Sequence, residues 1–565
     1  MADSKPNPIK RILKILRFEK KEISDIYFYA ILNGLVNLSL PLGIQSIISF
    51  VLGGAISTSI VILILLVVFG VVMTGLFQVN QMKLIEKIQQ KLFVRYSFEF
   101  ANSIPKLNLR SVDRYYLPEL TNRFFDTTTL QKGLAKLLLE IPAATIQIVF
   151  SLLLLSFYHP VFIFFGLVLI TLIFLILRFT GHKGLETSIQ ESNHKYEVAG
   201  WLEEMARVVT SFKFSKGSIL HFKNTDEDVT KYLNARTSHF NILLIQYWAL
   251  IAFKVAITAA MLIVGSILLV NQQLNIGQFI AAEIIILTVI GSVEKLIINL
   301  ENVYDVLTSV EKLGKLTDQP LEESGKLKLE RKEDGLSIQA NIASFGYEDG
   351  NPVIRNINFD VKPGEKIAVM GPNGSGKSSL IRLLCGAYQP FDGVICLDDI
   401  SINNYDIDSI RSQTGILLST QDLFKGTLLE NITMGNSAIS YQEINRLANI
   451  VGLKSFIDSR QEGLQMEINP TGNRLPRKIV LRLLLLRALV NNPRLLLLEE
   501  PWLGLEETYC RSIKNYILEG MPKTTALVVT NDIDFASNCD KVLYMEEGTL
   551  KISGDWNTVQ QALNK

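Results

Sequence analysis

Apolar residues in the first half of the chain fall in long runs, whereas the second half alternates short apolar and polar stretches. Six runs before Glu301 are near or above the length of about 20 residues that a helix needs to span a bilayer. They are Ile23–Leu52, Ile60–Val79, Gly133–Phe157, Val161–Phe179, Ile242–Val270 and Ile276–Leu300. The pattern predicts six transmembrane helices, of which the second, third, fifth and sixth continue into charged amphipathic stretches beyond the bilayer.

Charge in the connections predicts the orientation of these helices. The loops "LGGAISTS", "FYHP" and "VNQQLNIG" carry no Lys or Arg, whereas "KLIEKIQQKLFVR" and "HKGLETSIQESNHK" are rich in charge. The positive-inside rule therefore places both termini in the cytoplasm of a multi-pass plasma-membrane protein. Ahead of the first span, the basic and amphipathic "IKRILKILRF" predicts an elbow helix on the inner membrane surface.

A leucine-rich stretch near the end of the chain, "RLLLLRALVNNPRLLLLEEP", is not a seventh span. Arginines and the helix-breaking "NNP" interrupt it, which predicts a helix over Arg482–Val490, a turn and a buried strand over Leu495–Leu498. Ligands of parallel sheets gather at the carboxyl ends of strands, so Glu499 and Glu500 are candidate site residues.

The segment "KIAVMGPNGSGKSSLIRLL" carries the clearest chemical signal. It reads as a strand, a glycine-rich loop and a helix, and it matches the phosphate-binding pattern G-x-x-x-x-G-K-[ST]. Backbone N–H groups of such a loop surround phosphate oxygens, a lysine reaches the β- and γ-phosphates, and a serine ligates Mg²⁺. The predicted ATP-binding residues here are Gly371, Asn373, Gly374, Ser375, Gly376, Lys377, Ser378 and Ser379.

These features predict an all-α transmembrane domain followed by an α/β P-loop nucleotide-binding domain. The expected divisions are an elbow helix at 1–22, six transmembrane helices at 23–320, a charged linker at 321–335 and a nucleotide-binding domain at 336–565. The formal net charge of +1 gives no support for nucleic-acid binding.

The chain resembles the ATP-binding cassette (ABC) transporters of the exporter half-transporter type over nearly its whole length. Tyr347 in "FGY" looks like the aromatic residue that stacks on adenine, and "LLLLEEP" looks like the Walker B strand. The resemblance implies that Glu500 is the catalytic carboxylate that prepares the attacking water. It also implies that Gln421 is a catalytic and ATP-contacting residue, and that Mg²⁺ is held by Ser378, Gln421 and Glu499.

Several positions depart from the family pattern. Where the family has Leu-Ser-Gly-Gly-Gln, this chain has "LPRKI", in which Pro476 has no hydroxyl or N–H group and Arg477 and Lys478 carry long side chains. One hypothesis is that Pro476 starts the next helix at its first position and that the motif has decayed. The other is that the two cations replace the lost backbone donors at the phosphate. We favour decay.

The remaining departures agree with decay. Glu499 stands where the family has a shorter aspartate, "WLGLE" replaces the serine- and aspartate-bearing D-loop, and Asn531 replaces the switch histidine. All five histidines precede residue 240, and an asparagine cannot carry a proton. Nucleotide binding is expected to be retained, and fast hydrolysis is not expected.

Ionisable residues within the spans are functional candidates, here Glu140, Lys254 and Glu283. We predict a pair between Glu140 and Lys254; the alternative is that both side chains reach the inner interface and water. By resemblance, "DRYYLPELTNRFFDTTT" and "EVAGWLEEMARVVTSFK" are coupling segments that dock on the nucleotide domain.

Two functions remain open from the sequence. The favoured one is a plasma-membrane exporter half-transporter that acts as a homodimer or heterodimer and couples ATP and Mg²⁺ binding, with slow hydrolysis at most, to export of an unidentified substrate. The alternative is a hydrolysis-deficient, nucleotide-sensing or regulatory membrane subunit. The intact phosphate loop supports both functions, whereas "LPRKI" and Asn531 favour the alternative or a pump that depends on a partner.

Overall fold

The computed structural model describes residues 8–53, 58–113, 115–347, 352–389, 391–472 and 474–563. Two compact units make up the chain. The helical unit comprises Met1–Lys106 and Arg114–Gln319, and the α/β unit comprises Leu107–Asp113 and Pro320–Lys565.

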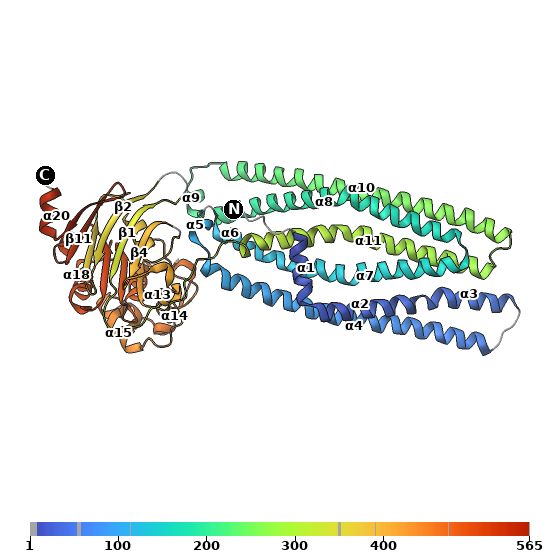
Figure 1. Cartoon of the computed structure of the whole chain (residues 1–565), viewed down its shortest axis with the longest axis horizontal. Helices are drawn as coiled ribbons and strands as arrows, with labels where there is room; N and C mark the ends of the chain where they lie inside the picture. Colours follow the sequence, from blue (N-terminus) through green and yellow to red (C-terminus); the bar gives the residue numbers. More distant parts are fainter. Residues whose placement is uncertain are drawn as a thin grey trace. The chain divides into compact units, whose positions relative to one another are not determined.

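Long helices run side by side in the helical unit (Figure 1). They are α2 (Lys20–Asn37), α3 (Ser39–Leu52), α4 (Thr58–Ser103), α7 (Asp126–Tyr158), α8 (Val161–Arg207), α10 (Leu220–Val270) and α11 (Ile276–Thr317). The shorter α1 (Pro8–Phe18) runs across them. Short helices lie in the connections: η1 (Ile104–Lys106), α6 (Leu117–Thr121), η2 (Asn122–Phe125) and α9 (Val209–Lys213). Within the described residues, six helical stretches are long and apolar enough to cross a membrane, which confirms the predicted transmembrane architecture.

Two details differ from the expected helices. The first span is divided into α2 and α3 at Leu38, because Pro41 in the first turn of α3 has no N–H to donate to the carbonyl of Asn37. The fourth span also extends far beyond a bilayer, since α8 is continuous over 47 residues. Its charged second half, from Arg178 onward, therefore continues the helix, as in the other long helices.

Helix α11 is the central packing element of the helical unit and contacts α7, α8 and α10. Its close approach to α8 depends on Gly184, where an added Cβ would lie 2.4 Å from Cζ of Tyr304. The Tyr304 hydroxyl accepts a hydrogen bond from Gln246 of α10 at 2.8 Å. A small residue thus permits a polar contact that joins three helices.

The predicted pair between Glu140 and Lys254 is wrong, because α11 supplies both partners. The Lys254 ammonium lies 2.7 Å from a carboxylate oxygen of Glu294, and Glu140 accepts a hydrogen bond from Asn299 at 2.6 Å. Since α11 packs against both α7 and α10, each charged residue finds its partner on this nearer helix.

The α/β unit contains two main sheets. The antiparallel sheet has the order β2-β1-β4-β5, formed by β1 (Ile338–Phe345), β2 (Ile354–Val361), β4 (Asp392–Leu397) and β5 (Ile400–Ser401). The mostly parallel sheet has the order β12-β11-β3-β10-β9-β6. It is formed by β3 (Lys366–Met370), β6 (Thr414–Leu417), β9 (Leu495–Glu499), β10 (Thr525–Val529), β11 (Lys541–Glu546) and β12 (Thr549–Gly554). A two-residue pair, β7 (Gly426–Thr427) and β8 (Glu467–Ile468), is separate.

Helices surround these sheets (Figure 1). They are α12 (Lys377–Leu384), α13 (Ile407–Arg411), α14 (Leu428–Thr433), α15 (Tyr441–Ile450), α16 (Lys454–Asp458), α17 (Arg477–Leu489), α18 (Glu507–Asn515), α19 (Ile533–Ser537) and α20 (Trp556–Leu563). Strands β3, β9 and β10 are buried along their whole length, so the leucine run before Glu499 is a core strand, as predicted. Because β6, β9, β10, β3 and β11 are parallel, their carboxyl ends share one edge of the sheet, where the candidate site lies.

Candidate functional site

The glycine-rich loop joins β3 to α12 and depends on backbone conformations that glycine tolerates. Gly371, Gly374 and Gly376 have φ angles of 142°, 82° and 95°. A Cβ on Gly371 would lie 2.0 Å from the carbonyl oxygen of Met545 on the neighbouring strand. The sequence pattern therefore corresponds to a backbone path that residues with side chains could not follow.

Lys377 begins α12 and turns its ammonium back over the loop. Nζ donates to the carbonyl oxygens of Gly371 and Pro372 at 2.7 and 2.8 Å. Burial lowers the pKa of Lys377, and the nearby carboxylates of Glu500 and Glu499 oppose that shift. The loop thus holds a buried cation beside its own carbonyls, where phosphate oxygens can compete for it.

Ser378 and Glu499 meet at the carboxyl end of β9. The Ser378 hydroxyl donates to one carboxylate oxygen of Glu499, and the backbone N–H of Ser419 donates to the other at 2.8 Å. A hydroxyl and a carboxylate are hard oxygen donors of the kind that Mg²⁺ prefers. The two side chains therefore fit a magnesium site, and the longer Glu499 reaches the serine directly.

Glu500 follows β9 in a left-handed backbone conformation with φ of 45°. Its N–H donates to the carbonyl of Val529 at 2.9 Å, which fixes the turn after the strand. Burial raises the pKa of Glu500; the Lys377 ammonium lowers it, whereas the Glu499 and Asp532 carboxylates raise it further. A carboxylate with a raised pKa beside a phosphate-binding lysine is suited to accept a proton from water.

Asn531 lies at the same edge, after β10. Its Oδ1 accepts a hydrogen bond from the N–H of Gly371 at 3.2 Å. This side chain therefore fixes the first residue of the phosphate loop, but it cannot carry a proton as a histidine would.

Tyr347 lies beside the phosphate helix. Its hydroxyl is 2.8 Å from the Ser379 hydroxyl and accepts from Nη1 of Arg382 at 3.3 Å. The ring is partly exposed. Such an anchored aromatic face is suited to stack on a nucleotide base.

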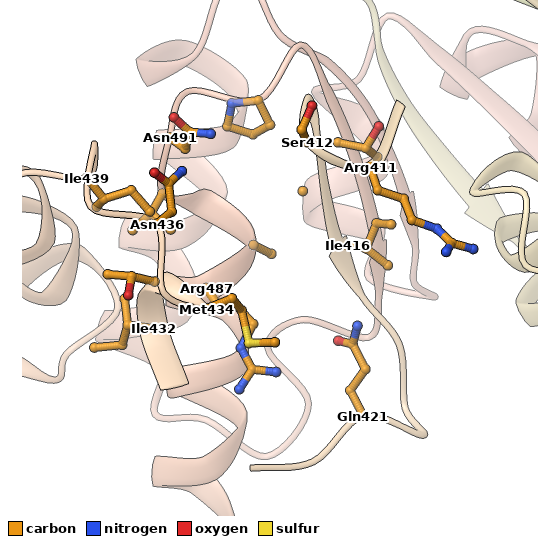
Figure 2. A pocket seen from close by; sticks show the side chains of 16 residues that line it. Arg411, Ser412, Ile416, Gln421, Ile432, Met434, Asn436, Ile439, Arg487 and Asn491 are labelled. Carbon is orange, nitrogen blue, oxygen red and sulfur yellow. The ribbon is translucent and has the colours of Figure 1, made fainter. Parts of the chain in front are cut away.

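Gln421 lines a separate cavity of about 410 Å³, together with Ile416, Met434 and Arg487 (Figure 2). Its side-chain oxygen accepts from the N–H of Leu418 at 3.2 Å, within its own loop. The structure thus does not join Gln421 directly to Ser378 and Glu499, although the same loop supplies the N–H of Ser419 to Glu499.

The "LPRKI" segment starts α17. Pro476 is the residue before the helix, one position earlier than predicted, and its carbonyl accepts from the N–H of Ile479 at 2.8 Å. Arg477 lies 3.7 Å from Asp422 and Lys478 lies 3.5 Å from Glu506, with both cations largely exposed. Each of these two cations therefore forms an ion pair with an acidic residue of the same chain.

Sequence reasoning missed three contributors to this site. Ser419 acts through its backbone N–H, which has no residue-type signature. Arg382 contacts Tyr347 from α12, and Tyr388 packs its ring against Tyr347 with centroids 5.1 Å apart. Arg382 lies on the same short helix as Lys377, but nothing in the sequence pairs it with an aromatic residue 35 positions earlier.

The helical unit has helices long enough to cross a membrane, and the α/β unit has a P-loop with charged residues at the carboxyl edge of its sheet. These two features define a nucleotide-binding membrane protein. The family model described as "ABC transporter transmembrane region" matches residues 26–293, and the model described as "ABC transporter" matches residues 354–503. Together the two models cover about three quarters of the sequence. The chain belongs to the ABC transporter family and has the domain order of an exporter half-transporter.

Curated relatives and a solved structure agree with this assignment. The chain is 29% identical over 305 residues to the leukotoxin translocation ATP-binding protein LktB of a Pasteurella haemolytica-like species (strain 5943B), covering 53% of this chain and 42% of LktB. It is 28% identical over 295 residues to the alpha-hemolysin translocation ATP-binding protein HlyB of Escherichia coli O157:H7, covering 51% and 41%. The chain thus aligns with less than half the length of these relatives. A bacterial Atm1-family ABC exporter with ATP bound has the same fold, with a TM-score of 0.83, 19% identity and 96% of each chain covered.

Proposed function

We propose that this chain binds Mg²⁺-ATP and acts as one half of a dimeric exporter in the plasma membrane, with both termini in the cytoplasm. The observation that carries the proposal is the convergence of Lys377, Ser378, Glu499 and Glu500 at one edge of the sheet. The family assignment adds six membrane helices to this ATP site. Nucleotide binding would hold two such chains together and reorient their helices.

Each residue at this edge has a proposed task. Lys377 binds the β- and γ-phosphates, and Tyr347 stacks on adenine. Ser378 and Glu499 would hold Mg²⁺, which would supply charge stabilisation to the phosphoryl group when bound. Gln421 would join them as a ligand only when its loop leaves the separate cavity. Glu500 accepts the proton of the attacking water, and Gln421 orients that water.

A second candidate is a nucleotide-sensing or regulatory membrane subunit that does not hydrolyse ATP. Two observations favour this candidate. Asn531 cannot carry a proton. Arg477 and Lys478 form ion pairs with Asp422 and Glu506 of the same chain. ATP binding is common to both candidates, so only turnover separates them.

Mg²⁺-ATPase activity of the full chain in lipid, measured beside Glu500→Gln, tests the proposal. We expect slow turnover that the substitution reduces about 100-fold or more, because general base catalysis contributes about 10²–10⁴-fold. Retained ATP binding in Glu500→Gln is the control for folding. ATP binding without turnover above that of the variant would instead support the sensing subunit.

The pH dependence of turnover is expected to follow Glu500. Burial raises its pKa. As the pH falls, Glu500 therefore becomes protonated, and can no longer act as a base, at a higher pH than a solvated glutamate, whose pKa is about 4.3. Activity should therefore fall as pH falls through this raised pKa, while ATP affinity changes less. A loss of turnover with its midpoint at or below the pKa of a solvated glutamate would show that Glu500 is not the base.

A further inference from the structure

A cavity of about 570 Å³ lies at the edge of the parallel sheet opposite the candidate ATP site. It is lined by residues 492–494, which lead into β9, and by residues 520–524, which lead into β10. Glu499 and Asn531 lie at or just after the carboxyl ends of the same two strands. A strand of five residues spans about 17 Å, so a small ligand in this cavity does not reach the phosphate loop.

Two buried cations hold the walls of this cavity in place. Arg494 is 5% exposed and donates to three carbonyls of residues 330–335, the loop that forms one wall. Lys366 is 4% exposed, and its ammonium donates to two carbonyls of residues 521–524 in another wall. Both loops are therefore preorganised, which lowers the entropic cost of binding a ligand between them.

Exposed cations surround the cavity. Arg331 and Lys332 come from the loop before β1, Arg446 comes from α15, and Lys523 comes from the loop before β10. Among the described residues that line the cavity, Glu333 is the one carboxylate, and it lies 2.6 Å from the Lys523 ammonium. The charges of the other three exposed cations therefore exceed the acidic charge of the lining, which favours an anionic ligand.

The two arginines are held near each other by the turn before β9. Arg331 donates to Oδ1 of Asn491 at 3.0 Å, and the N–H of Asn491 donates to Glu443 at 2.9 Å. Glu443 lies one turn before Arg446 on α15. Guanidinium groups in such an arrangement suit phosphate oxygens, which accept two parallel hydrogen bonds from each planar fork.

Part of the lining is apolar. The Tyr516 ring is half-buried, with the Arg446 guanidinium 5.4 Å from its centroid and donating to its hydroxyl at 3.1 Å. Pro493 and Met521, both buried, also line the cavity. A cavity of this size that combines apolar surface with a few placed polar groups fits a small organic molecule.

We propose that this cavity binds a small organic phosphate, with its phosphate oxygens on Arg331 and Arg446 and its apolar part against Tyr516. The site is separate from the candidate ATP site, and the inference does not depend on ATP binding or hydrolysis.

Isothermal titration calorimetry of the full chain in lipid nanodiscs tests this site with phenyl phosphate, a dianionic phosphate that carries one apolar ring. All proteins in the series carry Lys377→Ala, which weakens competing binding at the phosphate loop. We expect one saturable site per chain. Arg331→Ala and Arg446→Ala should each weaken it about 10-fold, the change expected for one charge-assisted contact. Glu333→Gln should strengthen it about threefold, because it removes the carboxylate of the lining.

A matched variant and two matched ligands are the controls. Arg460→Ala removes an exposed arginine that contacts the Phe456 ring outside this cavity, and it should leave affinity unchanged. Inorganic phosphate has no ring and should bind about 10-fold more weakly than phenyl phosphate. Benzoate keeps the ring but carries a single charge, and should also bind about 10-fold more weakly. Thermal unfolding of each variant, expected within about 2 °C of its parent, reports on folding.

Three results would overturn the proposal. They are the absence of saturable binding, equal affinity in Arg331→Ala, Arg446→Ala and Arg460→Ala, and equal affinity for phenyl phosphate and either control ligand. Titration of the wild-type chain with ATP is a separate measurement. Failure of ATP to bind there would overturn the proposed function and leave the organic phosphate site standing.

Discussion

Replacing Lys377 by alanine is expected to weaken Mg²⁺-ATP binding about 100-fold or more. Charge-assisted hydrogen bonds contribute about 1.5–3 kcal/mol each, and the ammonium is placed to exchange two loop carbonyls for phosphate oxygens. Loss of the cation also removes the charge that opposes the raised pKa of Glu500, so residual turnover should fall as well. Fluorescent ATP titration of the full chain measures the affinity directly.

Lys362→Ala is the matched control, because Lys362 is an exposed lysine just ahead of β3. It should bind ATP as wild type does. Lys377→Arg adds a second comparison, since it keeps the charge but replaces the compact ammonium by a planar guanidinium. Binding within about threefold of wild type in Lys377→Ala would contradict the phosphate-binding assignment.

The second large effect is expected on stability, from Arg494→Ala. Arg494 is 5% exposed and donates to the carbonyls of Glu330, Asp334 and Gly335 and to the carboxylate of Asp398 at 2.7 Å. Truncation leaves that carboxylate and three carbonyls without their donor. Breaking a buried charge pair costs about 3–5 kcal/mol, which for a unit of this size lowers Tm by about 10 °C.

Thermal unfolding of the full chain, followed by calorimetry, would resolve the transition of the α/β unit. Arg331→Ala provides the comparison, because Arg331 is exposed and makes a single side-chain hydrogen bond to Asn491. Its Tm should change by less than about 2 °C, as is usual for surface positions. An equally small change for Arg494→Ala would show that the contacts of this arginine do not stabilise the unit.

Continuous apolar segments along the chain were sufficient to predict the architecture. The six apolar runs and the buried strand before Glu499 are read from composition, because a bilayer and a parallel sheet both exclude polar residues over a fixed length. The phosphate loop was also predictable, since its glycines and Lys377 act through the local backbone. These features depend on neighbours in sequence.

Contacts between distant side chains were not predictable in the same way. Glu140 and Lys254 were paired because both are ionisable residues within predicted spans, but the sequence does not say which helices are adjacent, and α11 supplies Glu294 instead. Similarly, Tyr388 contacts Asp113 from 275 positions away, and nothing in the predicted coupling segment that begins at Asp113 indicates this partner. Such pairings follow from helix packing and loop placement, which one sequence does not encode in a visible pattern.

The folded-back ammonium of Lys377 has a consequence for how affinity can be tuned. The ammonium already donates to two loop carbonyls before a nucleotide binds. Its contribution to the free energy of nucleotide binding is therefore the difference between its hydrogen bonds to phosphate oxygens and its hydrogen bonds to these carbonyls. A substitution that strengthens the two hydrogen bonds which Lys377 gives up therefore weakens nucleotide binding, tenfold for each ~1.4 kcal/mol, without touching the nucleotide. Stability and ligand affinity are thus opposed at this loop, and selection for a more rigid protein would raise the ATP concentration at which it responds.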